Sequence, residues 1–359
     1  MSGSFAKLFA RMALVSAAFA MAMPASVSVA KEPLAKDLFG GMKLPAATAP
    51  KSYGFYSKGC FSGGMAIATD GPTWQAMRLS RNRRWGHPTM INLIERLSRE
   101  ATQDGWPGLL VGDISQPRGG PMLTGHASHQ IGLDADIWLT KMPSKTLSAT
   151  ERENMSAISV IKQGGLTVDE RIWTPEHAKL LKRAASYEEV ERILVHPGIK
   201  KKLCETVTGE RSWLRKVRPF WGHDYHFHIR IGCQPGSAGC KPQDATPKSD
   251  GCDESLAWWF TEEPWRPATG PVKPKARDIM TMASLPKECR AVLAAPSPAS
   301  EMAVTIGGNG TAMAAAPAMA EPALEPASTM APAGLPATAS AFAPTPDIKV
   351  PMPKPRPSN

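Results

Sequence analysis

The sequence predicts a single α+β domain whose central antiparallel sheet is flanked by helices and long loops. Apolar residues recur with helical spacing in two segments, residues 90–97 and 177–185. Three short apolar runs have the character of strands, at residues 108–111, 193–196 and 226–231. Proline and glycine are spread through the connections, which favours long loops. We assign residues 31–291 to this domain, a length for which one hydrophobic core is sufficient.

The first thirty residues have the composition of a secretory signal peptide. Two basic residues precede an apolar stretch from Met12 to Met23, and the small residues Ser28-Val29-Ala30 suit a signal peptidase. A transmembrane helix needs about 20 apolar residues, and this stretch is shorter. We therefore expect residues 1–30 to be cleaved on export, with no stable membrane insertion afterwards. An uncleaved N-terminal anchor is the alternative.

Residues 292–359 are rich in alanine, proline and methionine and contain almost no aromatic or β-branched residues. Such a segment buries too little apolar surface to offset the entropy lost on ordering. We therefore predict that residues 292–359 form a disordered tail.

The cysteine count and the net charge both bear on the partners of the chain. Six cysteines in an exported chain make three disulfides the default expectation, and no spacing among them gives the paired clusters of a cysteine-ligated zinc site. The formal net charge is +10, and removing the two basic residues of the acid-free signal segment leaves +8. This excess favours an anionic partner. Export makes carboxylate-rich peptides accessible and argues against nucleic acid.

Five of the eight histidines fall in two short segments. The first reads GHASHQIGLDADIW (residues 125–138) and ends as a strand, and the second, WGHDYHFHIRI (residues 221–231), alternates as a strand does. Residues two apart on a strand share a face. We therefore expect His226, His228 and Arg230 to project to one polar side. Phe227, Ile229 and Ile231 are expected to face the core.

Two imidazoles on one strand face, with a histidine and a carboxylate from another segment, suit a catalytic zinc ion. Three nitrogen or oxygen ligands leave the fourth position of the metal for water. Zinc lowers the pKa of that water to about 7 and polarises a carbonyl, while a neighbouring histidine transfers protons. The sequence therefore predicts a hydrolytic metal site.

These residues resemble a known zinc signature. In this sequence six residues separate His129 from Asp136, and a His226-x-His228 pair follows much later. This pattern is similar to that of D-Ala-D-Ala carboxypeptidases, lysostaphin-type enzymes and penicillin-insensitive murein endopeptidases. Over roughly residues 40–290 the sequence around these residues resembles the penicillin-insensitive murein endopeptidases. The segments that carry this resemblance are SRNRRWGHP (80–88), GDISQPRGGP (112–121), GHASHQIGLDADIW (125–138) and LRKVRP (214–219).

The resemblance implies that His129, Asp136 and His228 are the ligands of a Zn²⁺ ion. Asp134 competes with Asp136, because the two share a face of an extended segment and only the family spacing separates them. If Asp136 is the ligand, Asp134 becomes a partner that orients a ligand histidine. The second metal position of some members needs an Asp-x-x-His element, and we find none near Asp169.

The remaining histidines divide into site and structural candidates. By resemblance, His126 is either a further metal neighbour or a group that holds substrate. His226 is the leading general base, and His223 is a second candidate that stabilises the tetrahedral oxyanion. Lone histidines usually pack or form hydrogen bonds, which is the role we expect for the others. These are His87, His177 and His196.

The resemblance also implies the disulfide pairing, because six cysteines by themselves allow fifteen connectivities. The implied bridges are Cys60–Cys289, Cys204–Cys252 and Cys233–Cys240. They join the ends of the domain, bracket the histidine strand and close a short loop after it.

The implied function is hydrolysis of D-alanyl–meso-diaminopimelyl cross-links in peptidoglycan of the periplasm, without a serine nucleophile and therefore insensitive to penicillin. A zinc D,D-carboxypeptidase or dipeptidase is one alternative. A wall-binding protein that has lost catalysis is another, against which the intact ligand set argues. The basic segments RLSRNRRW and RSWLRKVR are either solvated loops or sources of arginines that bind substrate carboxylates.

Overall fold

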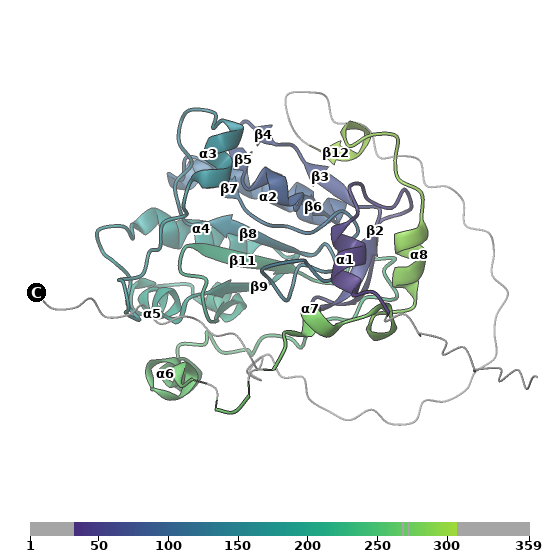
Figure 1. The fold of residues 1–359 in the computed structure, drawn as a ribbon. Helices are drawn as coiled ribbons and strands as arrows, with labels where there is room; N and C mark the ends of the chain where they lie inside the picture. Colours follow the sequence, from purple (N-terminus) through teal and green to yellow (C-terminus); the bar gives the residue numbers. More distant parts are fainter. Residues whose placement is uncertain (1–31, 268, 272, 307–359) are drawn as a thin grey trace, which may run out of the picture. The chain divides into compact units, whose positions relative to one another are not determined.

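The computed structural model describes residues 32–267, 269–271 and 273–306 (Figure 1). The predicted signal segment, residues 1–30, and the predicted tail from residue 307 onward lie outside the described residues. Within the described ranges, no helix is long and apolar enough to cross a membrane.

A mixed sheet with the strand order β10-β9-β11-β8-β7-β5-β4 forms the centre of the domain (Figure 1). Its strands are β4 (Asp70–Gly71), β5 (Trp74–Ala76), β7 (Leu109–Val111), β8 (Asp134–Trp138), β9 (Val190–Val195), β10 (Val217–Pro219) and β11 (His226–Ile231). The middle strands β9, β11, β8 and β7 are antiparallel neighbours. The pairs β10–β9 and β5–β7 are parallel. The predicted α+β class is confirmed, and the parallel pairs at the sides make the sheet mixed.

Two smaller sheets accompany the central one. β1 (Lys51–Phe55) and β2 (Lys58–Ser62) form an antiparallel hairpin. β3 (Met65–Ile67) pairs antiparallel with β6 (Trp85–Gly86) and parallel with β12 (Thr305–Ile306). The last described strand, β12, is therefore attached to strands more than two hundred residues earlier in the chain.

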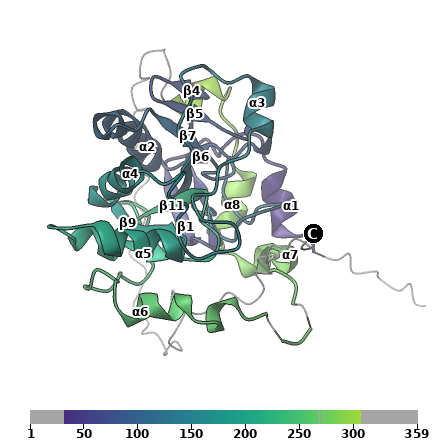
Figure 2. The same cartoon turned by 90° about the vertical axis from the view of Figure 1, so that its left-hand side faces the viewer.

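Three amphipathic helices, α2 (Pro88–Ala101), α4 (Pro175–Ser186) and α5 (Pro197–Thr206), lie along one side of the central sheet (Figure 2). α1 (Ala35–Gly40) and α8 (Glu288–Ala294) lie on the other side. Shorter helices occupy the connections: α3 (Ala149–Asn154), α6 (Glu254–Ala257) and α7 (Ala276–Ile279).

The histidines expected to be structural all begin helices. His87 and His196 are the N-caps of α2 and α5, where their Nδ1 atoms accept backbone N–H groups at 3.2 and 3.1 Å. His177 lies in the first turn of α4 and accepts the N–H of Thr174 at 3.0 Å. Each side chain satisfies a backbone donor that the helix leaves without a partner.

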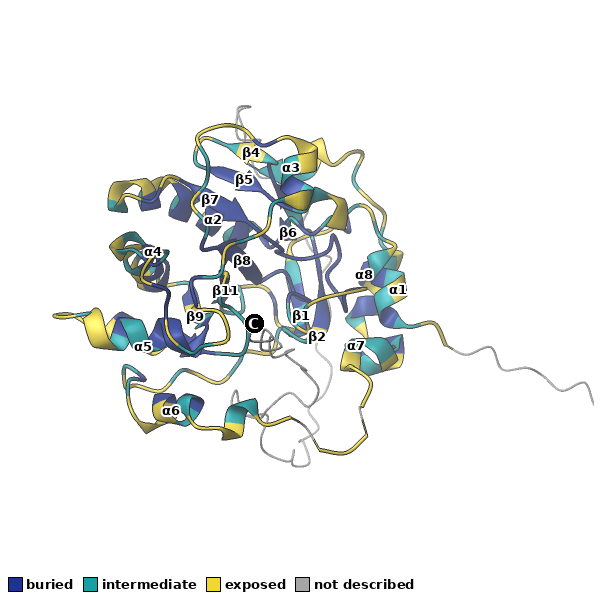
Figure 3. Ribbon diagram, turned by 60° about the vertical axis from the view of Figure 1, so that its left-hand side comes forward, coloured by how far each residue is buried: buried dark blue, intermediate teal, exposed yellow. Residues whose placement is uncertain are grey.

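The alternation along β11 divides its side chains between the core and the site, as predicted. Phe227, Ile229 and Ile231 belong to the main hydrophobic core, which also receives apolar side chains of α2 and α4. His226, His228 and Arg230 occupy the opposite face but are also buried, with exposures of 6%, 1% and 5%. Figure 3 shows that the paired strands β8 and β11 are buried along their length.

The structure contains the three disulfides Cys60–Cys289, Cys204–Cys252 and Cys233–Cys240, and no cysteine is free. These are the pairs that the resemblance implies. Cys60 on β2 and Cys289 on α8 lie in a second apolar cluster, so this bridge attaches α8 to the hairpin.

The folded region extends past the predicted boundary at residue 291, so the prediction that the tail starts at residue 292 was wrong for residues 292–306. The buried Arg118 guanidinium donates to the carbonyls of Val292, Leu293 and Ala295, each at 2.7 Å. β12 then pairs with β3. Hydrogen bonds to the backbone hold this segment, and its composition does not reveal them.

We predict that the Cys60–Cys289 bridge stabilises the fold more than the Cys233–Cys240 bridge. The first spans 229 residues and the second 7, and closing a longer loop removes more entropy from the unfolded chain. Replacing Cys60 and Cys289 by alanine should lower the free energy of unfolding by about 2–5 kcal/mol. Urea denaturation of both double variants measures the difference. A larger loss in the Cys233/Cys240 variant would contradict the prediction.

Candidate metal centre

The pairing of β8 with β11 brings the two predicted ligand segments together. In this antiparallel register Asp136 stands opposite His228, and Asp134 stands opposite Arg230. The loop that precedes β8 carries His126 and His129 to the same place. Segments about ninety residues apart in the chain therefore meet on one sheet face, with 92 residues separating Asp136 from His228.

The nitrogen atoms of three histidines surround the Asp136 carboxylate. His228 Nδ1 lies 3.1 Å and His129 Nε2 lies 3.4 Å from Oδ1, while His126 Nε2 lies 3.4 Å from Oδ2. Potential ligand atoms of His126, His129 and Asp136 lie within 4.8 Å of one another. The side chains of His129, Asp136 and His228 are buried, and His126 is partly exposed.

His129 is held in an unusual conformation by its neighbours. Its φ of +66° lies in the left-handed region, and its backbone N–H donates to Asp134 Oδ2 at 3.1 Å. The ring Nδ1 donates to the carbonyl of Ile114 at 2.6 Å. In the neutral ring that a metal ion requires, Nε2 therefore carries the lone pair, and this buried atom has no hydrogen-bond partner among the described residues. An unpartnered imidazole nitrogen facing a carboxylate fits a metal ion.

Asp134 connects the two histidine segments. Its Oδ1 accepts a hydrogen bond from His228 Nε2 at 2.8 Å, and its Oδ2 accepts the backbone N–H of His129. With Nε2 of His228 engaged, Nδ1 is the ring nitrogen that faces Asp136. This arrangement favours the orienting role for Asp134 over the ligand role, because both of its oxygens are used.

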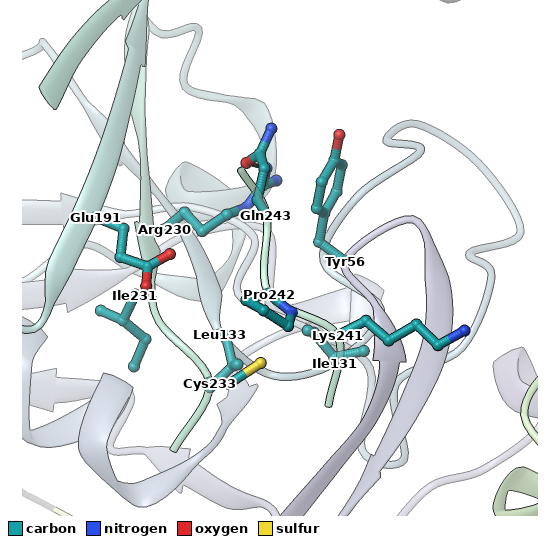
Figure 4. A pocket seen from close by; sticks show the side chains of 10 residues that line it. All are labelled: Tyr56, Ile131, Leu133, Glu191, Arg230, Ile231, Cys233, Lys241, Pro242 and Gln243. Atoms are coloured by element: carbon teal, nitrogen blue, oxygen red, sulfur yellow. Dashed lines mark hydrogen bonds between the residues drawn. The ribbon is translucent and has the colours of Figure 1, made fainter. Parts of the chain in front are cut away.

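Arg230 completes this network, and sequence reasoning assigned it no role. Its Nε donates to Asp134 Oδ1 at 2.6 Å, and its Nη1 donates to Gln243 Oε1 at 2.7 Å. The guanidinium lies over the ring of Tyr56, 3.5 Å from the centroid. Figure 4 shows Arg230 beside Gln243, with Tyr56 on the neighbouring loop. The alternation of β11 places Arg230 on the face of His228, which is the signal that points to it.

Asp113 is a second residue that sequence reasoning missed. It follows β7, is 4% exposed, and its Oδ2 accepts hydrogen bonds from Arg83 at 2.8 Å and Arg81 at 3.2 Å. The same oxygen lies 3.3 Å from His126 Nε2. Burial opposes ionisation, but His126 and the two arginines outweigh it and lower the pKa of Asp113 below its usual range. The only sequence signal was its place in the GDISQPRGGP segment.

The charges of the cluster favour a bound cation. Burial disfavours a charged His129, but the carboxylates of Asp136, Asp134 and Asp113 outweigh this and raise its pKa to about 9. For Asp136 burial acts against ionisation, and His129 with the neighbouring histidines keeps its pKa well below the usual value. Three ionised carboxylates therefore share one buried site, which suits a divalent cation.

His226 and His223 lie beside this cluster without belonging to its closest contacts. His226 Nε2 lies 3.6 Å from Asp136 Oδ1, and the ring centroids of His223 and His226 are 4.9 Å apart. Burial lowers the pKa of His226 to about 4 and holds that of His223 well below its usual value. Both imidazoles are therefore neutral at pH 7, and a neutral imidazole accepts a proton.

We predict that Asp134→Asn weakens metal binding. The amide keeps the size of the carboxylate, but it loses the charge that holds His228 and the ion pair with Arg230. Losing such an outer partner costs roughly 10–100-fold in metal affinity. Competition of the metal-loaded protein with a chromogenic chelator measures the change. The matched control is Asp250→Asn, which removes a carboxylate paired with Arg211. Equal metal affinity in wild type and Asp134→Asn would show that Asp134 does not support the metal ligands.

Comparison with known proteins identifies the family of this chain. The sequence model of the family described as penicillin-insensitive murein endopeptidase matches residues 52–294. Proteins of that name are similar over most of their length: one from Haemophilus influenzae is 45% identical over 222 residues, covering 62% of this chain and 77% of the relative. One from Pectobacterium atrosepticum is 39% identical over 249 residues, covering 69% and 86%. The chain therefore belongs to the penicillin-insensitive murein endopeptidase family.

Proposed function

We propose that this chain is a zinc-dependent endopeptidase of the periplasm that hydrolyses the D-alanyl–meso-diaminopimelyl cross-links of peptidoglycan. Family membership supports the reaction class. The observation that carries the proposal is the convergence of His126, His129 and His228 on the buried Asp136 carboxylate. Three disulfides support an oxidising compartment outside the cytoplasm.

We assign the metal ligands to His129 Nε2, one oxygen of Asp136 and His228 Nδ1, with His126 as a further neighbour of the metal. The hydrogen bonds to Ile114 and Asp134 leave these ring nitrogens facing the carboxylate. When bound, zinc supplies a water of pKa about 7 and a Lewis acid for the scissile carbonyl. Imidazole and carboxylate donors of this kind suit zinc.

His226 is the proposed general base. Neither of its buried ring nitrogens has a hydrogen-bond partner among the described residues, and Nε2 lies on the side of Asp136. A neutral imidazole in this place can take a proton from the attacking water and pass it to the leaving amine.

His223 is proposed to face the oxyanion. Its φ of +56° and the hydrogen bond from Nδ1 to the carbonyl of Trp221, at 2.8 Å, fix the orientation of its ring. The only proton of the neutral ring is used in this bond, so Nε2 must first take up a proton before it can donate to the carbonyl oxygen on which charge develops.

The direct test is cleavage of isolated, cross-linked muropeptide dimers by the purified mature protein, followed by mass spectrometry. We expect conversion of dimers to monomers that a chelator abolishes, that added Zn²⁺ restores and that penicillin does not affect. Intact dimers together with release of a terminal D-alanine from monomers would instead support the D,D-carboxypeptidase alternative. Intact substrates in the presence of bound zinc would support a wall-binding protein.

We predict that His228→Ala and His226→Ala lose activity for different reasons. His228→Ala should lose bound zinc together with cleavage. His226→Ala should retain zinc and lose roughly 10²–10⁴-fold in kcat, because proton transfer is slowed while the ligands remain. Zinc content by elemental analysis and kcat on dimers separate the two effects.

The matched control for these variants is His87→Asn, which replaces a buried histidine but keeps an N-cap acceptor for α2. It should retain both zinc and activity. Full activity in His226→Ala would remove this residue from the mechanism, and stoichiometric zinc in His228→Ala would remove that residue from the ligand set.

A further inference from the structure

The segment RLSRNRRW contains four arginines, and the structure separates them by the partners of their guanidinium groups. Arg78 donates to the carbonyl of Met155 at 2.8 Å and lies over the ring of Trp138. Arg83 is bound by Asp113 and by the carbonyl of Thr124, at 2.8 and 2.9 Å. Both side chains have structural partners that account for them.

Arg84 is likewise engaged, by the carbonyl of Ile67 and the carboxylate of Glu301. Arg81 differs from the other three. Its side chain is 45% exposed, and its bond from Nη1 to Asp113 Oδ2, at 3.2 Å, is the one hydrogen bond that its guanidinium makes within the described part of the chain. Most of its donors remain available.

Arg81 stands at the edge of the metal centre. The Asp113 oxygen that it contacts lies 3.3 Å from His126 Nε2, and the same nitrogen lies 3.4 Å from Asp136 Oδ2. His126 is 26% exposed at this edge. Asp113 also receives the buried Arg83, so the two arginines together carry more positive charge than Asp113 neutralises. The excess charge lies on the exposed member of the pair.

The backbone holds Arg81 in this place. Arg81 ends the short 3₁₀ helix Leu79–Arg81, which is bracketed by Arg78 and Asn82, with φ values of +55° and +52°. Both are residues other than glycine in the left-handed region, where side chains are strained. Such conformations persist only where surrounding contacts enforce them.

Contacts on both sides enforce this turn. Ser80 donates to the carboxylate of Glu153 from its backbone N–H at 2.8 Å and from its hydroxyl at 2.9 Å. Asn82 donates to the carbonyl of Lys43 at 3.1 Å and accepts from Trp85 Nε1 at 2.7 Å. These contacts fix the backbone on both sides of Arg81 and therefore restrict where its guanidinium can lie.

We propose that Arg81 binds a carboxylate of the substrate, namely the one on the residue that supplies the leaving amine of the scissile amide. This inference rests on the proposed function. In meso-diaminopimelate the carbon that bears the cross-linking nitrogen also bears a carboxylate, so that group lies close to the bond that is cut. A guanidinium presents a planar fork that matches a carboxylate, and the donors of Arg81 that Asp113 leaves unused lie at the edge of the site that holds His126 and Asp136.

The test compares two muropeptide dimers that differ in this one group, the free carboxylate and its primary amide. Arg81→Gln and Arg81→Lys are measured beside Arg99→Gln, which removes an exposed arginine of α2. For the carboxylate dimer we expect Arg81→Gln to lower kcat/KM roughly 10–100-fold, mainly through KM, as the loss of a charge-assisted hydrogen bond predicts. Arg81→Lys should recover part of the loss, and Arg99→Gln should behave as wild type.

The amide dimer separates substrate binding from structural support. Wild type should cleave it more slowly than the carboxylate dimer, and Arg81→Gln should cleave it as well as wild type does, with unchanged zinc affinity. Equal losses on both dimers, or a loss of zinc in Arg81→Gln, would show that Arg81 only supports Asp113 and would overturn the inference.

Calorimetric binding of the same dimers to zinc-loaded protein that carries His226→Ala, with Arg81 or Arg81→Gln, keeps this test independent of turnover, because His226→Ala should retain zinc and slow cleavage. If wild type cleaves neither dimer, the proposed function fails, and binding still decides the role of Arg81. Tighter binding of the carboxylate dimer that disappears in Arg81→Gln supports the inference. Equal binding of both dimers, or no binding of either, overturns it.

Discussion

The antiparallel pairing of β8 with β11 is the interaction on which the site depends. Its register places Asp136 opposite His228 and Asp134 opposite Arg230. Each carboxylate of β8 therefore faces an imidazole or a guanidinium of β11. A slip of one residue would turn every one of these side chains into the core. The apolar residues of β11 prevent the slip, because Phe227 and Ile229 are buried among helices α2 and α4.

Burying three carboxylates in one place is costly unless each has partners. Asp134 has Arg230 and His228, and Asp113 has Arg83 and Arg81. Asp136 has histidines alone, and two of the nitrogens around it lack hydrogen bonds among the described residues. The polar network is therefore satisfied at its periphery and incomplete at its centre, which is the arrangement expected where a cation completes the charge balance.

Local patterns predicted the elements that bear the site and much of its chemistry. The residues 226–231 form β11 as predicted, and the helical spacing at residues 90–97 and 177–185 corresponds to α2 and α4. These predictions succeeded because a strand that buries one face leaves its alternation in the sequence, and an amphipathic helix leaves a period of 3.6 residues. The boundary at residue 291 failed because Arg118, more than 170 residues away, binds the carbonyls of the segment that follows.

The sequence by itself determined the fold class, the two histidine segments and which side chains of β11 share a face, because these follow from short-range periodicity and residue chemistry. Only the tertiary structure decided that Asp134 joins both histidine segments and that Arg230 lies between Tyr56 and Gln243. It also decided which arginine of RLSRNRRW remains exposed beside Asp113. These assignments depend on contacts between segments far apart in the chain. Packing of the whole domain sets the distances between such segments, and the spacing of residues along the sequence does not predict them.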